Sequence, residues 1–72
     1  MDKSKFNMLI GDTLRDLRER EKLSQEELAS KSGSHTNYIG AIERGERSIT
    51  VYKLYKILKA LNIDLSDFFE NI

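Results

Sequence analysis

The fold is decided by residues 24–44, which read SQEELASKSGSHTNYIGAIER. Ser24 and Glu27 form a capping-box pattern, in which the serine oxygen accepts the third helical amide and the glutamate reaches back to the cap. This pattern predicts a helix that begins at Ser24. We expect the helix to end near Ser32, because Gly33 follows and glycine adopts the left-handed conformation of a helix end easily.

A second short helix is expected over residues 35–44, ended by Gly45. Ile39 and Ile42 form its apolar pair, at a spacing that puts both on one face. Two short helices joined by three or four residues around a glycine are a helix-turn-helix candidate. Ala29 suits a close crossing of the two axes, where little more than a methyl group fits, and Gly33 allows the sharp turn.

Three further helices are expected around this pair, spanning about residues 5–21, residues 51–61 after a Thr50 cap, and a short segment from Asp64. Asn62 is the expected stop of the middle one. The apolar faces of the two longer helices are expected to consist of Phe6, Ile10, Leu14 and Leu17, and of Val51, Leu54, Leu58 and Leu61. The sequence thus predicts an all-α, compact five-helix bundle, a single domain over residues 1–72, with Ile10, Leu14, Leu17, Leu28, Ile39, Ile42, Leu54 and Leu58 as its core.

Composition excludes several classes of function. The 72 residues include no cysteine and one histidine, His35, which excludes disulfides and thiol catalysis and argues against a zinc site. No carboxylate pair, nucleophile–base set or phosphate loop is visible, so we expect no enzyme, cofactor, metal or small-molecule ligand. No apolar run approaches the ~20 residues of a membrane span, and no secretory signal is apparent. We expect a cytoplasmic, soluble domain.

Charge is balanced overall, with twelve basic and twelve acidic residues, but it is unevenly distributed. Residues 35–59 carry five basic and two acidic side chains, whereas residues 60–72 carry three acidic ones and no basic one. If the fold gathers residues 35–59 on one side, that side is a basic face with an acidic tail elsewhere. Ordinary solvated surface is the alternative interpretation of the same distribution.

The outer face of the helix over residues 35–44 is suited to a DNA groove. With Ile39 and Ile42 inward, the opposite face carries small or polar side chains and ends in an arginine, and its members are Thr36, Asn37, Gly40, Ala41 and Arg44. Small residues let a helix enter the major groove, about 12 Å wide. Asn can pair with adenine and Thr can contact a thymine methyl, so we expect this set to contact bases.

The sequence resembles the Cro/C1-type (Xre-like) helix-turn-helix repressors. The resemblance rests on Leu17-Arg18, residues 23–29, Tyr38-Ile39, residues 42–45 and residues 54–61. Within that family it looks most like the small controller proteins of restriction–modification systems, above all over residues 37–50. The resemblance covers about residues 9–70. It implies a lambda-repressor-like DNA-binding domain with its helix-turn-helix at about residues 24–44. It also implies an ion pair between Arg18 and Glu43 that locks the third helix to the first.

Phosphate contacts are expected around the groove-facing helix, from Gln25, His35, Tyr38, Arg47, Ser48 and Thr50. Gln25 begins a helix, and helix N-termini favour anions. His35 is either a cap or a neighbour of phosphate. For Tyr38, stacking on the core and hydrogen bonding to phosphate are equally acceptable interpretations.

The terminal segment, about residues 61–72, holds more large apolar side chains than one short helix can turn into a small core. The excess predicts an exposed apolar patch, and a two-fold self-association is the commonest way to cover one. The resemblance points the same way, since the controllers pair through their C-terminal helices. The expected homodimer interface consists of Ile63, Leu65, Phe68, Phe69 and Ile72, although Phe68 can instead point into the core of the monomer.

These features lead to one functional interpretation and one alternative. The main interpretation is a sequence-specific DNA-binding transcriptional regulator that binds a pseudo-palindromic, double-stranded operator as a homodimer, with a restriction–modification controller as the specific case. The alternative is an antitoxin-type module that binds both DNA and a partner toxin protein. An activator and a repressor have the same features at this level.

Overall fold

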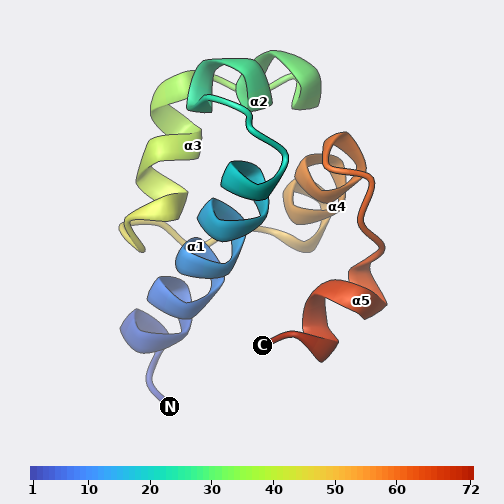
Figure 1. Cartoon of the computed structure of the whole chain (residues 1–72). Coiled ribbons are helices and arrows are strands. Elements are labelled where there is room, and N and C mark those ends of the chain that lie inside the picture. Colours follow the sequence, from blue (N-terminus) through green and yellow to red (C-terminus); the bar gives the residue numbers. More distant parts are fainter.

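The computed structural model describes all 72 residues and consists of five helices joined by short turns, with no strand (Figure 1). The helices are α1 (Lys3–Arg20), α2 (Gln25–Ser32), α3 (Thr36–Glu43), α4 (Val51–Ala60) and α5 (Leu65–Glu70). The five expected helices are all present, and each boundary lies within two residues of the predicted one. No helix is both long and apolar enough to pass through a bilayer.

Local sequence explains where α1, α2 and α4 begin. Asp2, Ser24 and Thr50 each accept a backbone N–H from the third helical residue, and Ser24 and Glu27 form the complete, reciprocal capping box. Each cap satisfies amide groups that a helix start otherwise leaves without a partner. The expected caps of α2 and α4 are therefore correct.

The first four helices end in the same way, with one residue in the left-handed conformation: Lys22, Gly33, Gly45 and Asn62. In each case the next amide reaches back to a carbonyl five residues earlier, as from Ser34 N to Ala29 O at 2.8 Å. This arrangement satisfies a terminal carbonyl and turns the chain sharply. Glycine and Asn62 were expected at such positions, whereas Lys22 was not.

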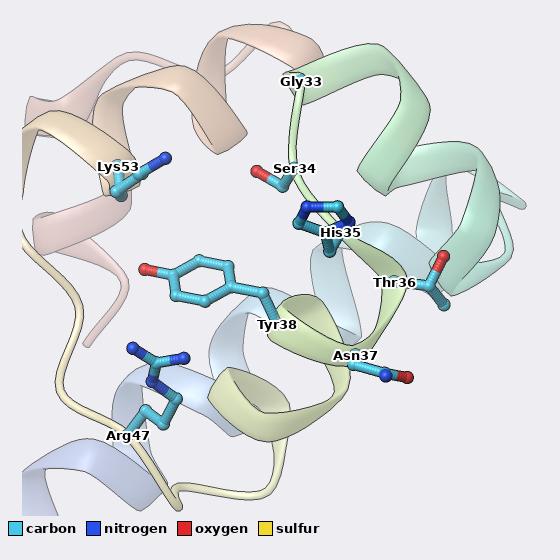
Figure 2. A pocket seen from close by; sticks show the side chains of 8 residues that line it. All are labelled: Gly33, Ser34, His35, Thr36, Asn37, Tyr38, Arg47 and Lys53. Carbon is cyan, nitrogen blue, oxygen red and sulfur yellow. The ribbon is translucent and has the colours of Figure 1, made fainter.

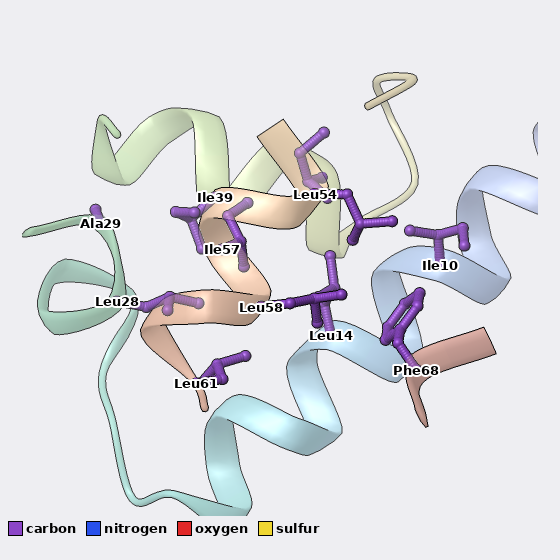
Figure 3. Packing of buried hydrophobic residues seen from close by; sticks show 11 residues of the cluster. Ile10, Leu14, Leu28, Ala29, Ile39, Leu54, Ile57, Leu58, Leu61 and Phe68 are labelled. Carbon is purple, nitrogen blue, oxygen red and sulfur yellow. The ribbon is translucent and has the colours of Figure 1, made fainter. Parts of the chain in front are cut away.

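The core lies where α1, α2, α3 and α4 meet, and α5 closes it from the side of α4 (Figures 1 and 3). Its eleven buried apolar residues are Ile10, Leu14, Leu28, Ala29, Ile39, Ile42, Leu54, Ile57, Leu58, Leu61 and Phe68. The radius of gyration is 11.0 Å, as expected for a close-packed domain of this length, about 11 Å.

Four apolar side chains lie elsewhere than the sequence suggested. Phe6 and Val51 were expected on inward faces but are 45% and 69% exposed, and Leu17 is only half-buried. Phe6 lies in the first turns of α1, which extend past the body of the bundle (Figure 1). Ile57, which is not among the expected core residues, is 1% exposed, and the buried face of α4 thus includes Ile57 in place of Val51.

Gly11 sets how closely α1 and α3 approach. A Cβ at this position would overlap the carbonyl oxygen of Ile42 and lie 2.7 Å from that of Glu43. Both obstacles are backbone atoms, which cannot swing aside as a side chain can. The two helices therefore cross at a distance that only glycine permits here.

Gly11→Ala should destabilise the protein by about 2 kcal/mol or more, because the added methyl group forces α1 and α3 apart. In an ordinary helix interior the same change stabilises by up to about 1 kcal/mol. Urea denaturation provides the measurement, with Asp16→Ala on the exposed face of α1 as the control. A Gly11→Ala variant as stable as the wild type would show that the close crossing is not required.

Candidate nucleic-acid interface

The turn between α2 and α3 fixes how the second helix of the pair is presented. Gly33 adopts a left-handed conformation with φ 69°, and the Ser32 hydroxyl donates to the Leu28 carbonyl at 2.8 Å. Ala29 is 2% exposed and lies in α2, which packs directly on α3. The small residue and the glycine thus have the positions that the spacing predicted.

The outer surface of α3 is polar, and its inner surface is apolar. Ile39 and Ile42 are both 2% exposed, while Asn37 is exposed and Thr36 and Ala41 are partly exposed. In Figure 2, the side chains of Thr36 and Asn37 extend on the opposite side of α3 from the side chain of Tyr38. The side chains of Thr36 and Asn37 are therefore available at the N-terminal end of α3, where recognition helices contact base edges.

Gly40 departs from the expectation that it lies on the open face. It is buried, and a Cβ there would lie 3.0 Å from Arg44 Nη1 and 3.5 Å from Gln25 Oε1. The side chains of Arg44 and Gln25 thus converge over Gly40 and cover it. A direct base contact from Gly40 does not fit this arrangement, since two longer side chains stand in front of it.

A buried ion pair fastens α3 to α1. Arg18 Nε donates to Glu43 Oε2 at 2.6 Å, and Arg18 Nη2 donates to Glu43 Oε1 at 3.0 Å. The Arg18 side chain is 10% exposed and that of Glu43 is 3% exposed. The third nitrogen of the guanidinium, Nη1, donates to the Leu23 carbonyl at 2.7 Å. The pair implied by the family resemblance is thus present.

Gln25 adds a third helix to the same cluster. Its Nε2 donates to Glu43 Oε1 at 2.9 Å, so the carboxylate at the end of α3 is held from both α1 and α2. The hydrogen bond to Glu43 raises the pKa of Arg18, which keeps the guanidinium charged. The sequence had suggested that Gln25 contacts phosphate, and the hydrogen bond to Glu43 was not expected. The two residues are eighteen positions apart, so no local sequence pattern indicates the contact.

A basic hollow of about 880 Å³ lies beside the N-terminal half of α3 (Figure 2). Its lining residues are Gly33, Ser34, His35, Thr36, Asn37, Tyr38, Arg47 and Lys53. Arg47 Cζ lies 5.1 Å and Lys53 Nζ 5.9 Å from the centre of the Tyr38 ring. Neither cation forms an ion pair with a carboxylate of the chain, so the hollow carries positive charge that is not neutralised internally.

Tyr38 keeps its proton in this hollow. Burial raises the pKa of its phenol above the ordinary value, and the nearby charge of Arg47 opposes that shift only in part. The hydroxyl is therefore a hydrogen-bond donor at neutral pH. Its ring packs against the core and also has the cations of Arg47 and Lys53 over it, so the structure is compatible with both alternatives for Tyr38.

Lys53 was not among the residues expected at the site. The available signal was its position as the third residue of α4, in the first turn after the Thr50 cap, where the helix dipole disfavours a cation.

Of the three remaining expected phosphate residues, Thr50 and Ser48 have partners within the chain. Thr50 Oγ1 accepts the Lys53 amide at 3.1 Å as the cap of α4, and Ser48 Oγ accepts from Asn7 Nδ2 at 3.2 Å. His35 is exposed and is the N-cap residue before α3, but its side chain makes no capping hydrogen bond. All three lie along one path, from the start of α3 through the loop to the start of α4.

The terminal segment divides its apolar side chains between core and surface. Phe68 is 1% exposed and packs into the core, near Ile10 (Figure 3), which is the second of the two positions expected for it. Phe69 and Ile72 are 48% and 38% exposed, and Ile63 and Leu65 are half-buried. A six-residue helix turns one of two adjacent phenylalanines inward and leaves the other outside.

Residues 14–68 match the family model described as Helix-turn-helix (HTH_3). The chain belongs to the helix-turn-helix family. It is 44% identical over 54 residues to the control protein C.SmaI of Serratia marcescens, covering 75% of this chain and 64% of that protein. The resemblance to Cro/C1-type regulators is thereby confirmed.

Solved structures of helix-turn-helix proteins share this fold. The restriction–modification controller protein C.AhdI of Aeromonas hydrophila has a TM-score of 0.90 and 36% identity, over 96% of this chain and 100% of that one. The controller protein C.Esp1396I was solved as a tetramer in complex with its natural 35 base-pair operator. It has a TM-score of 0.85 and 32% identity, and the match covers 90% of this chain and 86% of that one. The predicted all-α fold is confirmed.

Removing one partner of the Arg18–Glu43 pair should destabilise this helix-turn-helix domain by about 3–5 kcal/mol, because a buried charge is then left without compensation. Denaturant unfolding of Arg18→Met, Glu43→Gln and the double variant measures the effect. We expect the double variant to lose clearly less stability than the two single losses added together. Additive losses would mean that the two side chains do not depend on each other.

Proposed function

We propose that this protein is a sequence-specific DNA-binding transcriptional regulator that uses α3 as its recognition helix. The observation that carries the proposal is the combination of an exposed polar face on α3 and a hollow beside it with two cations that no carboxylate neutralises. The polar face provides groups that can read bases, and the cations provide attraction for the phosphate backbone. Both belong to one surface, fixed to the core through Glu43.

Base contacts are assigned to Thr36, Asn37, Ala41 and Arg44. Asn37 presents an amide that can accept from and donate to an adenine edge in the major groove, and Thr36 and Ala41 offer methyl groups for thymine. Arg44 is exposed at the C-terminal end of the same face. Gly40 is not assigned a base contact; it leaves room for the side chains of Arg44 and Gln25, which cover it.

Phosphate contacts are assigned to Tyr38, Arg47 and Lys53, which share the hollow, and to the neighbouring groups of His35, Ser48 and Thr50. For Gln25, the backbone amide at the start of α2 remains a candidate, because its side chain is hydrogen-bonded to Glu43. Since the chain has no net positive charge, the local cations must supply the electrostatic part of binding. Affinity should therefore fall as salt rises.

We further propose a homodimer that binds a pseudo-palindromic operator. The exposed Phe69 and Ile72, with the partly exposed Ile63 and Leu65, give α5 an apolar surface that a second copy can cover. The chain measures 31 Å in its longest direction. Two copies joined through α5 can thus place their α3 helices about 34 Å apart, one turn of DNA.

A restriction–modification controller is the specific role that we propose. Support comes from the relatives named as control proteins, among them C.SmaI and C.AhdI, and from the operator complex of C.Esp1396I. Inspection of the genes beside this one tests the role. Adjacent methyltransferase and endonuclease genes are expected, and their absence beside a small toxin gene would contradict the controller role.

Asn37→Ala should weaken binding to the preferred site by about 1–3 kcal/mol and relax the base preference at one position. The site is first enriched from a random pool of duplexes by the wild-type protein, and both proteins are then titrated with it. A random-sequence duplex is the control and should bind both proteins alike. Equal affinity for the enriched site would exclude Asn37 from recognition.

Phe69→Ala should shift the monomer–dimer equilibrium toward monomer by tenfold or more, because a half-exposed aromatic ring is removed from the proposed interface. Sedimentation equilibrium at micromolar concentrations measures this shift. Phe6→Ala removes a similarly exposed ring from α1, with 45% against 48% exposure, and should leave the equilibrium unchanged. A wild-type protein that is monomeric throughout would refute the dimer.

A further inference from the structure

Glu46, in the turn after α3, holds the side chain of Arg44 in one orientation. Arg44 Nε donates to Glu46 Oε2 at 2.8 Å, and Arg44 Nη2 donates to Glu46 Oε1 at 3.1 Å. Both side chains are 57% exposed, so the pair contributes little to the stability of the fold. A two-bond, fork-to-fork geometry nevertheless fixes the plane of the guanidinium.

The pair leaves one edge of the guanidinium open. Arginine has five N–H groups, and Glu46 accepts from Nε and from one N–H of Nη2. Nη1 makes no hydrogen bond within the chain, and the second N–H of Nη2 lies beside it. These end groups form a fork with the spacing that guanine O6 and N7 require, which is the commonest specific contact of arginine in the major groove.

The position of Arg44 directs this open edge to the reading face. Arg44 follows Asn37 by seven residues and Ala41 by three, so the three side chains lie on one stripe of the helix. A Cβ at position 40 would lie only 3.0 Å from Nη1, so the glycine leaves room for the guanidinium to rest over the helix at this point. The charged group therefore lies across the surface of α3 instead of extending freely toward solvent.

We propose that Glu46 is a specificity-determining residue. It holds the Arg44 side chain in place, so that the end of the guanidinium can form two hydrogen bonds with a guanine in each operator half-site. This inference rests on the proposed function and adds to it one base and one positioning residue. By holding the fork in place, Glu46 reduces the rotamer freedom that Arg44 loses on binding. Its carboxylate also makes a loose contact of Arg44 with random phosphates less favourable.

The test compares wild type with Glu46→Gln, Arg44→Ala and the double variant. The wild-type protein first enriches its site from a random pool, and each protein is then titrated with that duplex, with single-base variants of it and with a random duplex. Glu21→Gln is the matched control, since it removes the same charge from an exposed residue that makes no side-chain hydrogen bond or ion pair. Melting temperatures show that all variants are folded.

We expect the enriched half-site to contain a guanine at which wild type discriminates by tenfold or more. Arg44→Ala should abolish discrimination at that base alone. Glu46→Gln should reduce the discrimination at that base about three- to tenfold, and this variant should bind random DNA more tightly than wild type. Glu21→Gln should match wild type in both measurements. In the Arg44→Ala background, Glu46→Gln should change nothing further at that base, because it acts through Arg44.

Three results would overturn the proposal. If Arg44→Ala weakens all duplexes alike, Arg44 contacts phosphate and no guanine is read. If Glu46→Gln and Glu21→Gln behave alike, Glu46 has no role beyond its charge, although the function as a regulator stands. If the wild-type protein enriches no sequence at all, the proposed function itself is wrong, and the role of Glu46 with it.

Discussion

The buried Glu43 carboxylate is the constraint on which the rest of the structure depends. It ends α3, accepts two hydrogen bonds from Arg18 of α1 and one from Gln25 of α2, and is almost wholly removed from solvent. A charge in such a place is stable only when its partners surround it. Three helices must therefore keep fixed relative positions, and the orientation of α3 follows from them.

Close packing reinforces the same orientation. Gly11 lets the backbone of α1 approach the last turn of α3, next to the carboxylate that Arg18 holds. Gly40, on the other side of α3, makes room for Arg44 and for the Gln25 side chain. The last turn of this eight-residue helix is thus held both by the ion pair and by the close approach of α1, and Gly40 leaves room for side chains on the other side. A surface built in this way can keep side chains in position before any ligand arrives, which lowers the entropic cost of binding.

Much of this organisation could be predicted from the sequence because it depends on short-range signals. The capping box at Ser24, the glycines after α2 and α3, and the spacing of Ile39 and Ile42 all act within a few residues and were interpreted correctly. Contacts between residues far apart in the sequence were harder to predict. Gly11, the Gln25–Glu43 bond and the place of Lys53 beside Tyr38 arise from packing between separate helices, and periodicity alone does not report them. Phe68 and Phe69 were ambiguous for a related reason, since the neighbouring helices decide which of two adjacent rings is buried.

The most direct test of the account maps the DNA-binding surface residue by residue. Amide and arginine Nε–H spectra of the ¹⁵N-labelled protein are recorded while a duplex enriched from a random pool is added. We expect the largest changes along α3, at Thr36, Asn37, Ala41 and Arg44, and around the hollow of Tyr38, Arg47 and Lys53. The Nε–H signal of Arg18 should stay nearly constant. Changes concentrated on the outer face of α4, with α3 unaffected, would contradict the claim that α3 is the recognition helix.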